Sequence, residues 1–142
     1  SSGGGGSGGG GGIFHFANNV TSTLDVINCT FVNNSTGSGG TGGGIGTVTQ
    51  GGGGVATTRL QNTLFSGSST SLAINTGFGG TPVVTSLGNN LANDNGGGFL
   101  TASGDLINTN AFLAPLANYG GPTPTCALLP GSPAINAGSG CC

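Results

Sequence analysis

Cysteines have the clearest chemistry in this 142-residue sequence, which contains Cys29, Cys126 and the adjacent pair Cys141 and Cys142. Four cysteines in a small chain are typical of an oxidising compartment, where they form disulfides. Adjacent cysteines rarely bond to each other, because their geometry departs from the preferred disulfide range. We therefore expect one bridge from the terminal pair to Cys126 and another to Cys29 of the same or an adjacent subunit. The terminal pair lacks the C-x2-C spacing of zinc sites, so no metal site is predicted.

Ionisable side chains are too few for most enzyme chemistry. The sequence has one Arg, no Lys, three Asp, no Glu and one His, and its formal net charge is -2. Asp25, Asp94 and Asp105 lie far apart, no hydroxyl has an evident base and orienter, and His15 is expected on the outer face of a strand. The sequence therefore predicts neither an enzyme nor a cofactor site. Nucleic acid is not expected as a partner, because phosphate binding needs several Lys or Arg.

Four asparagines begin N-x-S/T sequons: Asn19, Asn28, Asn33 and Asn34. They are candidates for glycosylation, although a sequence rich in Asn and Thr also produces such matches by chance. The sequence contains no Met, which predicts that a leader was removed before residue 1. No apolar stretch approaches the roughly 18 residues of a membrane span. We therefore expect an extracellular or cell-surface protein without a membrane span, with glycans as candidate partners.

Small residues dominate the composition: Gly, Ser, Thr and Asn make up 81 of the 142 residues. A chain so poor in long side chains cannot fill a wide globular core, so it needs a thin interior and many backbone hydrogen bonds. Short period-two segments rich in Thr and Val predict strands, and no window has the apolar spacing of a helix. Asn and Gly between these segments fit the left-handed corners of stacked coils.

Two landmarks repeat along the sequence. Residues 27–35 align with residues 60–68 at an offset of 33, and the Gly-rich runs that end at Ile13 and Ile45 recur at an offset of 32. A third, weaker unit covers residues 72–91. Because repeats of about 20 to 50 residues are typical of solenoids, the sequence predicts stacked coils of short strands.

Three segments follow from these patterns: a Gly-rich N-terminal segment over residues 1–12, β-helix coils over residues 13–91, and a capping segment over residues 92–142 that includes the terminal Cys pair. Five of the six Pro lie at or after residue 115. Because Pro cannot donate to a strand ladder, this tail is expected to run along an edge or outer face and to act as a cap. The predicted fold is all-β, a parallel β-helix (β-solenoid) of few coils with a Pro-rich C-terminal cap.

Residues 86–138 resemble the C-terminal part of the choice-of-anchor Q domain of bacterial surface proteins, most densely in GGPTPT at 120–125 and ALLPGSPAI at 127–135. The GGGI run that ends at residue 45 and the FVNN run from residue 31 are similar to the short repeats of polymorphic outer-membrane proteins. The resemblance implies a right-handed parallel β-helix with a structural or adhesive role and no catalytic residues. The chain departs from the family at Cys126 and Asn136, where His and Asp are common.

The predicted coil stack has two ends. The Pro-rich tail is a candidate cover for one of them, and nothing comparable is found near residue 1, where the Gly-rich segment is expected to lie against a neighbour. Each end exposes unpaired N–H and C=O groups, which proteins normally guard with Lys, other charges, bulges or a covering helix, and this chain has no Lys. Head-to-tail contact between such ends generates a fibre unless it closes into a ring. We therefore expect a structural subunit of an extracellular filament or matrix that assembles with copies of itself and is reinforced by disulfides.

Two other functions fit the same fold. A cell-surface adhesin or glycan-binding module would need exposed aromatic side chains, for which Tyr119 and Phe78 are the candidates. An ice-binding protein would need a flat array of Thr, and T-x-T segments occur at residues 21–23, 47–49 and 123–125. These segments do not recur at one spacing, so the sequence favours the structural role.

Overall fold

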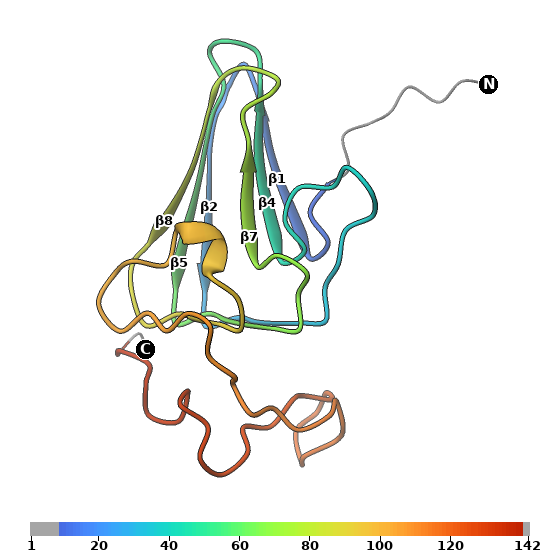
Figure 1. Ribbon diagram of the computed structural model, residues 1–142, viewed down its shortest axis with the longest axis vertical. Coiled ribbons are helices and arrows are strands. Elements are labelled where there is room, and N and C mark those ends of the chain that lie inside the picture. Colours follow the sequence, from blue (N-terminus) through green and yellow to red (C-terminus); the bar gives the residue numbers. More distant parts are fainter. Residues whose placement is uncertain (1–8, 141–142) are drawn as a thin grey trace, which may run out of the picture.

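The computed structural model describes residues 9–140, and Figure 1 shows a stack of strands followed by a long irregular C-terminal segment. All nine strands that it contains lie between residues 13 and 92, and a single short 3-10 helix, η1, follows them. The strands are β1 (Ile13–Asn18), β2 (Thr21–Ile27), β3 (Thr30–Val32), β4 (Ile45–Gln50), β5 (Val55–Gln61), β6 (Leu64–Ser66), β7 (Leu72–Asn75), β8 (Thr81–Ser86) and β9 (Leu91–Ala92), and η1 is Gly96–Gly98. The prediction of an all-β chain is confirmed.

The strands form three parallel sheets of three strands each: β1–β4–β7, β2–β5–β8 and β3–β6–β9. Each run of three consecutive strands contributes one strand to every sheet, so the chain winds through three stacked coils. This architecture is solenoid-like, as the repeats predicted. The third coil, β7 to β9, coincides with the weak unit expected over residues 72–91.

The pairing register corrects one of the two predicted offsets. Ile13 pairs with Ile45, which confirms the offset of 32, but Ile27 pairs with Gln61, so the second offset is 34 and the predicted 33 is wrong. The reason is side-chain alternation, because a slip of one residue would turn a whole strand's side chains to the opposite face. With the observed register, Phe31 and Phe65 lie opposite each other and both are buried in the interior.

Left-handed asparagines form the corners between strands, as predicted. Asn19, Asn28, Asn33, Asn62 and Asn89 all have φ between 49° and 56°, a region that Asn tolerates better than other side chains. Asn28 and Asn62 occupy the same corner in successive coils, and the Asn62 Nδ2 donates to the Asn28 Oδ1 at 3.2 Å. A side-chain amide hydrogen bond therefore joins this corner of the first coil to that of the second.

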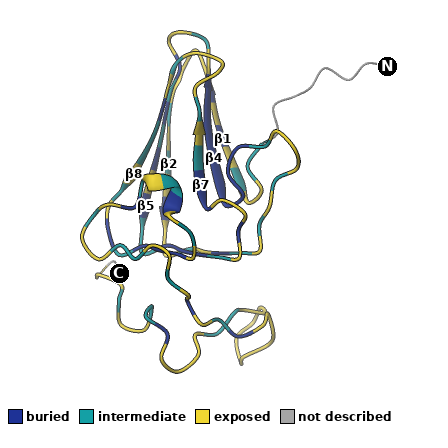
Figure 2. Ribbon diagram, viewed as in Figure 1, coloured by how far each residue is buried: buried dark blue, intermediate teal, exposed yellow. Residues whose placement is uncertain are grey.

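A narrow apolar core lies inside the coils, and Figure 2 shows in dark blue the buried residues of the strands. Its buried members are Val26, Phe31, Ile45, Leu60, Phe65, Leu72, Ala92 and Leu100. Each coil supplies only a few large side chains, so the core is continuous along the stack but thin across it.

The C-terminal tail lies against one outer face of the stack (Figure 1). Phe65 and Ala92 point into the core, so their neighbours Leu64 and Leu91 point outward. There they form a second buried cluster with Ala111, and Leu113 and other tail residues pack against it. The tail thus follows the outer face of the β3–β6–β9 sheet.

Candidate functional site

The first coil presents three edge strands at one end of the stack. Within residues 9–140, no strand pairs with the outer sides of β1, β2 and β3. Asn28 donates its backbone N–H to the Gln61 carbonyl at 3.1 Å, so the N–H groups of Asp25 and Ile27, which alternate with it, point away from β5. Such a row of backbone groups is a template for another strand.

The side chains of this end do not guard it. Phe14 and Phe16 stack at a centroid distance of 5.7 Å on the outer face of β1, and each is 43% exposed. Asp25 is the one charged residue of the first coil, and it is neutralised by Arg59, whose Nε and Nη2 donate to its two carboxylate oxygens at 2.5 and 2.6 Å. These hydrogen bonds hold the pKa of Asp25 below its ordinary value. The first-coil end therefore carries two exposed aromatic rings and is close to uncharged.

The opposite end is closed by the segment that follows β9. Leu100 is buried in the core and Phe99 packs against it, so this segment covers the interior of the third coil. Leu106 pairs beside β9: its N–H donates to the Asn90 carbonyl, and its carbonyl accepts from the Ala92 N–H, both at 2.8 Å. The two ends of the stack thus differ.

Proline also blunts this second end. Thr81 of β8 donates its N–H to the Gly54 carbonyl at 2.7 Å, so the backbone nitrogen of the next residue, Pro82, points away from β5. Proline has no N–H to offer there, and natural sheets use it to protect edge strands. The β8 edge is therefore a poorer template than the β2 edge.

Two of the three carboxylates hold the closed end together. Asp105 accepts from the Ser86 hydroxyl at 2.6 Å, the Asn90 N–H at 2.9 Å and the Ala102 N–H at 2.8 Å. Asp94 accepts from two further backbone N–H groups, at 2.7 and 2.9 Å. Both carboxylates satisfy donors of the chain's own backbone, which is a structural role.

His15 lies inside the coil stack, so its predicted place on the outer face is wrong. It is 8% exposed; its Nδ1 lies 2.9 Å from the Thr58 hydroxyl and its Nε2 lies 3.0 Å from the Ser22 hydroxyl. Thr58 in turn bonds to Thr47 at 2.7 Å. Desolvation by burial lowers the pKa of His15 below 6.5. Ser22 therefore has a basic partner that the sequence did not reveal, but a hydroxyl rather than a carboxylate orients the ring.

Cys29 and Cys126 are free thiols in this structure and are half-buried. Both line a groove of about 510 Å³ between the Asn corners and the tail. The groove also reaches Ser139, whose N–H donates to the Asn62 Oδ1 at 3.1 Å. Cys141 and Cys142 lie outside the described residues, so the disulfides expected with the terminal pair stay a prediction.

The four sequon asparagines lie at or next to coil corners. Asn19, Asn28 and Asn33 are exposed, and each occupies a left-handed corner. Asn34 is half-buried beside Asn33. Their corner positions give the first three a structural reason to be asparagine that is independent of glycosylation.

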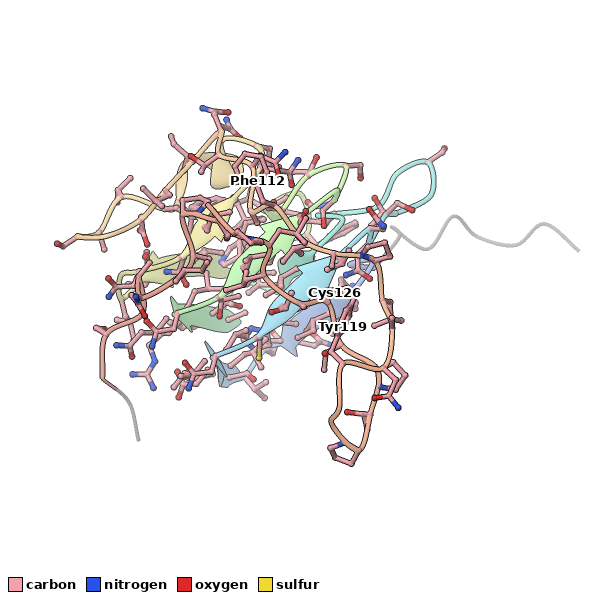
Figure 3. The ribbon with its side chains drawn as sticks, turned by 90° about the horizontal axis from the view of Figure 1, so that it is seen from below. Phe112, Tyr119 and Cys126 are labelled. Carbon is pink, nitrogen blue, oxygen red and sulfur yellow. The ribbon has the colours of Figure 1, made fainter. Side chains whose placement is uncertain are left out.

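The two aromatic candidates for glycan binding lie on different elements. Tyr119 is 48% exposed on the tail, where its hydroxyl donates to the Pro115 carbonyl at 2.8 Å (Figure 3). Phe78 is 42% exposed in the loop between β7 and β8. Figure 3 also shows Phe112 and Cys126 on the tail, and Phe112 is unusual for a bulky residue in having a φ of 47°.

The T-x-T segments have different environments. Thr47 and Thr49 are fully buried in the interior, and residues 123–125 lie on the tail. Only Thr21 and Thr23 are exposed on the outer face of a sheet. The sequence missed that the pairing register places further Thr beside these two, and an alignment at an offset of 34 would have revealed Thr57 opposite Thr23.

Comparison with known protein families, curated proteins and solved structures gave no match. Among the described residues, no three His, Cys, Asp or Glu side chains are grouped so that they could hold a metal ion. No helix in that part of the chain is long and apolar enough to cross a membrane. Within residues 9–140, the fold and the site define a solenoid-like stack of three coils, in which the first coil is bare of strand partners and the third coil is closed by the segment after β9.

Proposed function

We propose that the protein is a structural subunit of an extracellular filament or matrix, which joins copies of itself through the bare first coil. The observation that supports this most is the contrast between the ends: the outer sides of β1 to β3 have no strand partner within residues 9–140, whereas Leu100, Leu106 and Pro82 protect the other end. Adding a strand to an exposed edge is a common mode of protein association.

Two arrangements use the first coil. In a head-to-tail filament, β2 of one copy lies against β8 of the next, and in a back-to-back pair β2 lies against β2 of a second copy. A back-to-back pair is closed and cannot lengthen by itself, so a filament also needs the second end, which Pro82 and the segment after β9 make the weaker template.

The finer features of the fold belong to the same proposal. We take the coils to wind to the right, because connections between parallel strands of one sheet are right-handed in about 98% of proteins. The tail, with its five Pro, acts as a lateral cap that covers the β3–β6–β9 sheet. We place the assembly outside the cell on the basis of the cysteine content and the family resemblance.

One row of outward side chains provides a matched test. Ile27, Gln61 and Leu87 occupy equivalent places in the first, second and third coils. We expect Ile27→Lys to reduce self-association in sedimentation velocity and electron microscopy, because Lys guards edge strands. Gln61→Lys adds the same charge to a central strand and should leave association unchanged.

Leu87→Lys distinguishes the two arrangements. It should have no effect on a back-to-back pair, whereas it should shorten a head-to-tail filament as strongly as Ile27→Lys does. If the wild-type protein sediments as a monomer at every concentration and salt, or if all three variants behave alike, the proposed function is wrong.

A further inference from the structure

The outer face of the β2–β5–β8 sheet is a regular array of short β-branched side chains. In β5, Ala56, Thr58 and Leu60 are buried, so Val55 and Thr57 point outward. The same alternation holds in β2 and β8. Apart from the Asp25–Arg59 pair and the row of Ile27, the outward side chains of the three strands are Thr21, Thr23, Val55, Thr57, Thr81, Val83 and Thr85.

The register aligns these side chains in rows across the three coils. One row is Thr21, Val55 and Thr81, and the next is Thr23, Thr57 and Val83. Neighbours in a row are separated by the strand spacing of about 4.8 Å, and successive rows by two residues of strand, about 6.6 Å. Five Thr and two Val therefore occupy a two-dimensional lattice.

Threonine gives such a lattice both a hydroxyl and a methyl group at fixed positions. Its branched Cβ restricts χ1. The ladder hydrogen bonds on both sides of β5 hold the central strand of the lattice in place. Of the described elements, none packs over this face. Its one charged pair, Asp25 and Arg59, is mutually neutralised.

We infer that this face binds ice. Methyl groups restrict the orientation of first-shell water, and regularly spaced hydroxyls bond that water in register. The strand spacing is close to the oxygen repeat of hexagonal ice, so water ordered on the rows matches the surface of a growing crystal. A flexible or charged surface would not hold water in such a lattice, and this face has a single ion pair and no Lys. The inference does not depend on self-association, because it uses the sheet face and not the strand edges.

Thermal hysteresis, the gap between the melting and freezing temperatures of a crystal in the protein solution, is the primary measurement. We expect the wild-type protein to show a gap and to be enriched in a slowly grown ice hemisphere. Thr57→Lys places a long charged side chain at the centre of the lattice and should abolish both signals. Thr76→Lys, in the exposed loop between β7 and β8, adds the same charge elsewhere and should preserve them.

A gain-of-function variant keeps the test decisive if Thr57→Lys fails to fold. Val55→Thr with Val83→Thr completes both rows with threonine, and a hydroxyl at these half-buried, outward-facing positions can still bond to water. The double variant should enlarge the thermal hysteresis gap. Absence of a gap in both the wild-type protein and the double variant, with circular dichroism showing a folded chain, would overturn the inference, as would a Thr57→Lys variant that is folded and still active.

Discussion

The ring of Phe31 stacks on the ring of Phe65, with centroids 4.9 Å apart and an angle of 14° between the ring planes. The two residues are 34 positions apart in sequence and directly paired between β3 and β6. They join the first coil to the second inside the thin apolar core. Because each coil contributes few large side chains, this stack is a principal contact that fixes the register.

Truncation of Phe65 should therefore be costly. Phe65 is fully buried, and Phe65→Ala removes the stack and leaves a cavity, for which we expect a loss of about 3–5 kcal/mol in the free energy of unfolding. Phe14→Ala removes a half-exposed ring from the outer face and serves as the control with a smaller loss. Urea denaturation measures both, and equal losses would contradict the assigned register.

His15 makes stability depend on pH. Burial lowers its pKa in the folded protein below the unfolded value of 6.5, so the unfolded chain binds the proton first as the pH falls. The contribution of neutral His15 to the free energy of unfolding should be fully present above pH 6.5. It should decline as the pH falls from 6.5 toward the pKa of His15 in the folded protein. In His15→Gln that decline should disappear from urea unfolding curves recorded in this range. The lowered pKa of Asp25 affects stability only as the pH falls below its ordinary value of 3.8.

Asp105 should contribute more to the free energy of unfolding, at the closed end, than Asp25 contributes at the first-coil end. Asp105→Asn replaces an acceptor oxygen with a donor among the Ser86, Asn90 and Ala102 donors, and the expected loss is about 1–3 kcal/mol. Asp25→Asn, at an exposed ion pair, is the matched control and should cost less. Hydrogen exchange at Asn90 and Leu106 would locate the effect, and unchanged protection there would contradict the role of Asp105.

The cysteines give a prediction that mass spectrometry can check. We expect native protein to resist alkylation at Cys126 until it is reduced, because Cys126 is predicted to bond to one of the two terminal cysteines. A Cys126→Ser variant should then alkylate at the terminal pair without reduction. Complete alkylation of all four thiols in unreduced native protein would exclude the expected bridges.

The coil architecture could be predicted because it depends on local features. Short strands and left-handed Asn corners leave their signature within a few residues, as Asn28 and Asn62 illustrate. The face on which a side chain lies depends instead on the pairing register, which a gap of one residue in an alignment reverses. His15 is a different case, because the offset of its strand was predicted correctly. A polar ring between two Phe was expected outside, whereas in the structure it is buried and the hydroxyls of Thr58 and Ser22 lie within hydrogen-bond distance of its two nitrogens.

Features made by distant segments were also beyond the sequence. The Thr lattice combines Thr23 and Thr57, which belong to unrelated local motifs and meet only through the ladder between β2 and β5. A capping segment was predicted over residues 92–142, but nothing in the local sequence around Leu100 shows that its side chain enters the core.

The parallel pairing also bears on how the chain folds. Each strand pairs with a strand roughly one coil away along the chain, and the coils contain no hairpin of sequence neighbours. The first native contact between two coils must therefore close a long loop, and the entropy cost of that closure comes before the ladder hydrogen bonds can form. This slows folding. During that wait the strands of the newly made chain are unprotected, so two chains made side by side can pair with each other before either has completed its third coil.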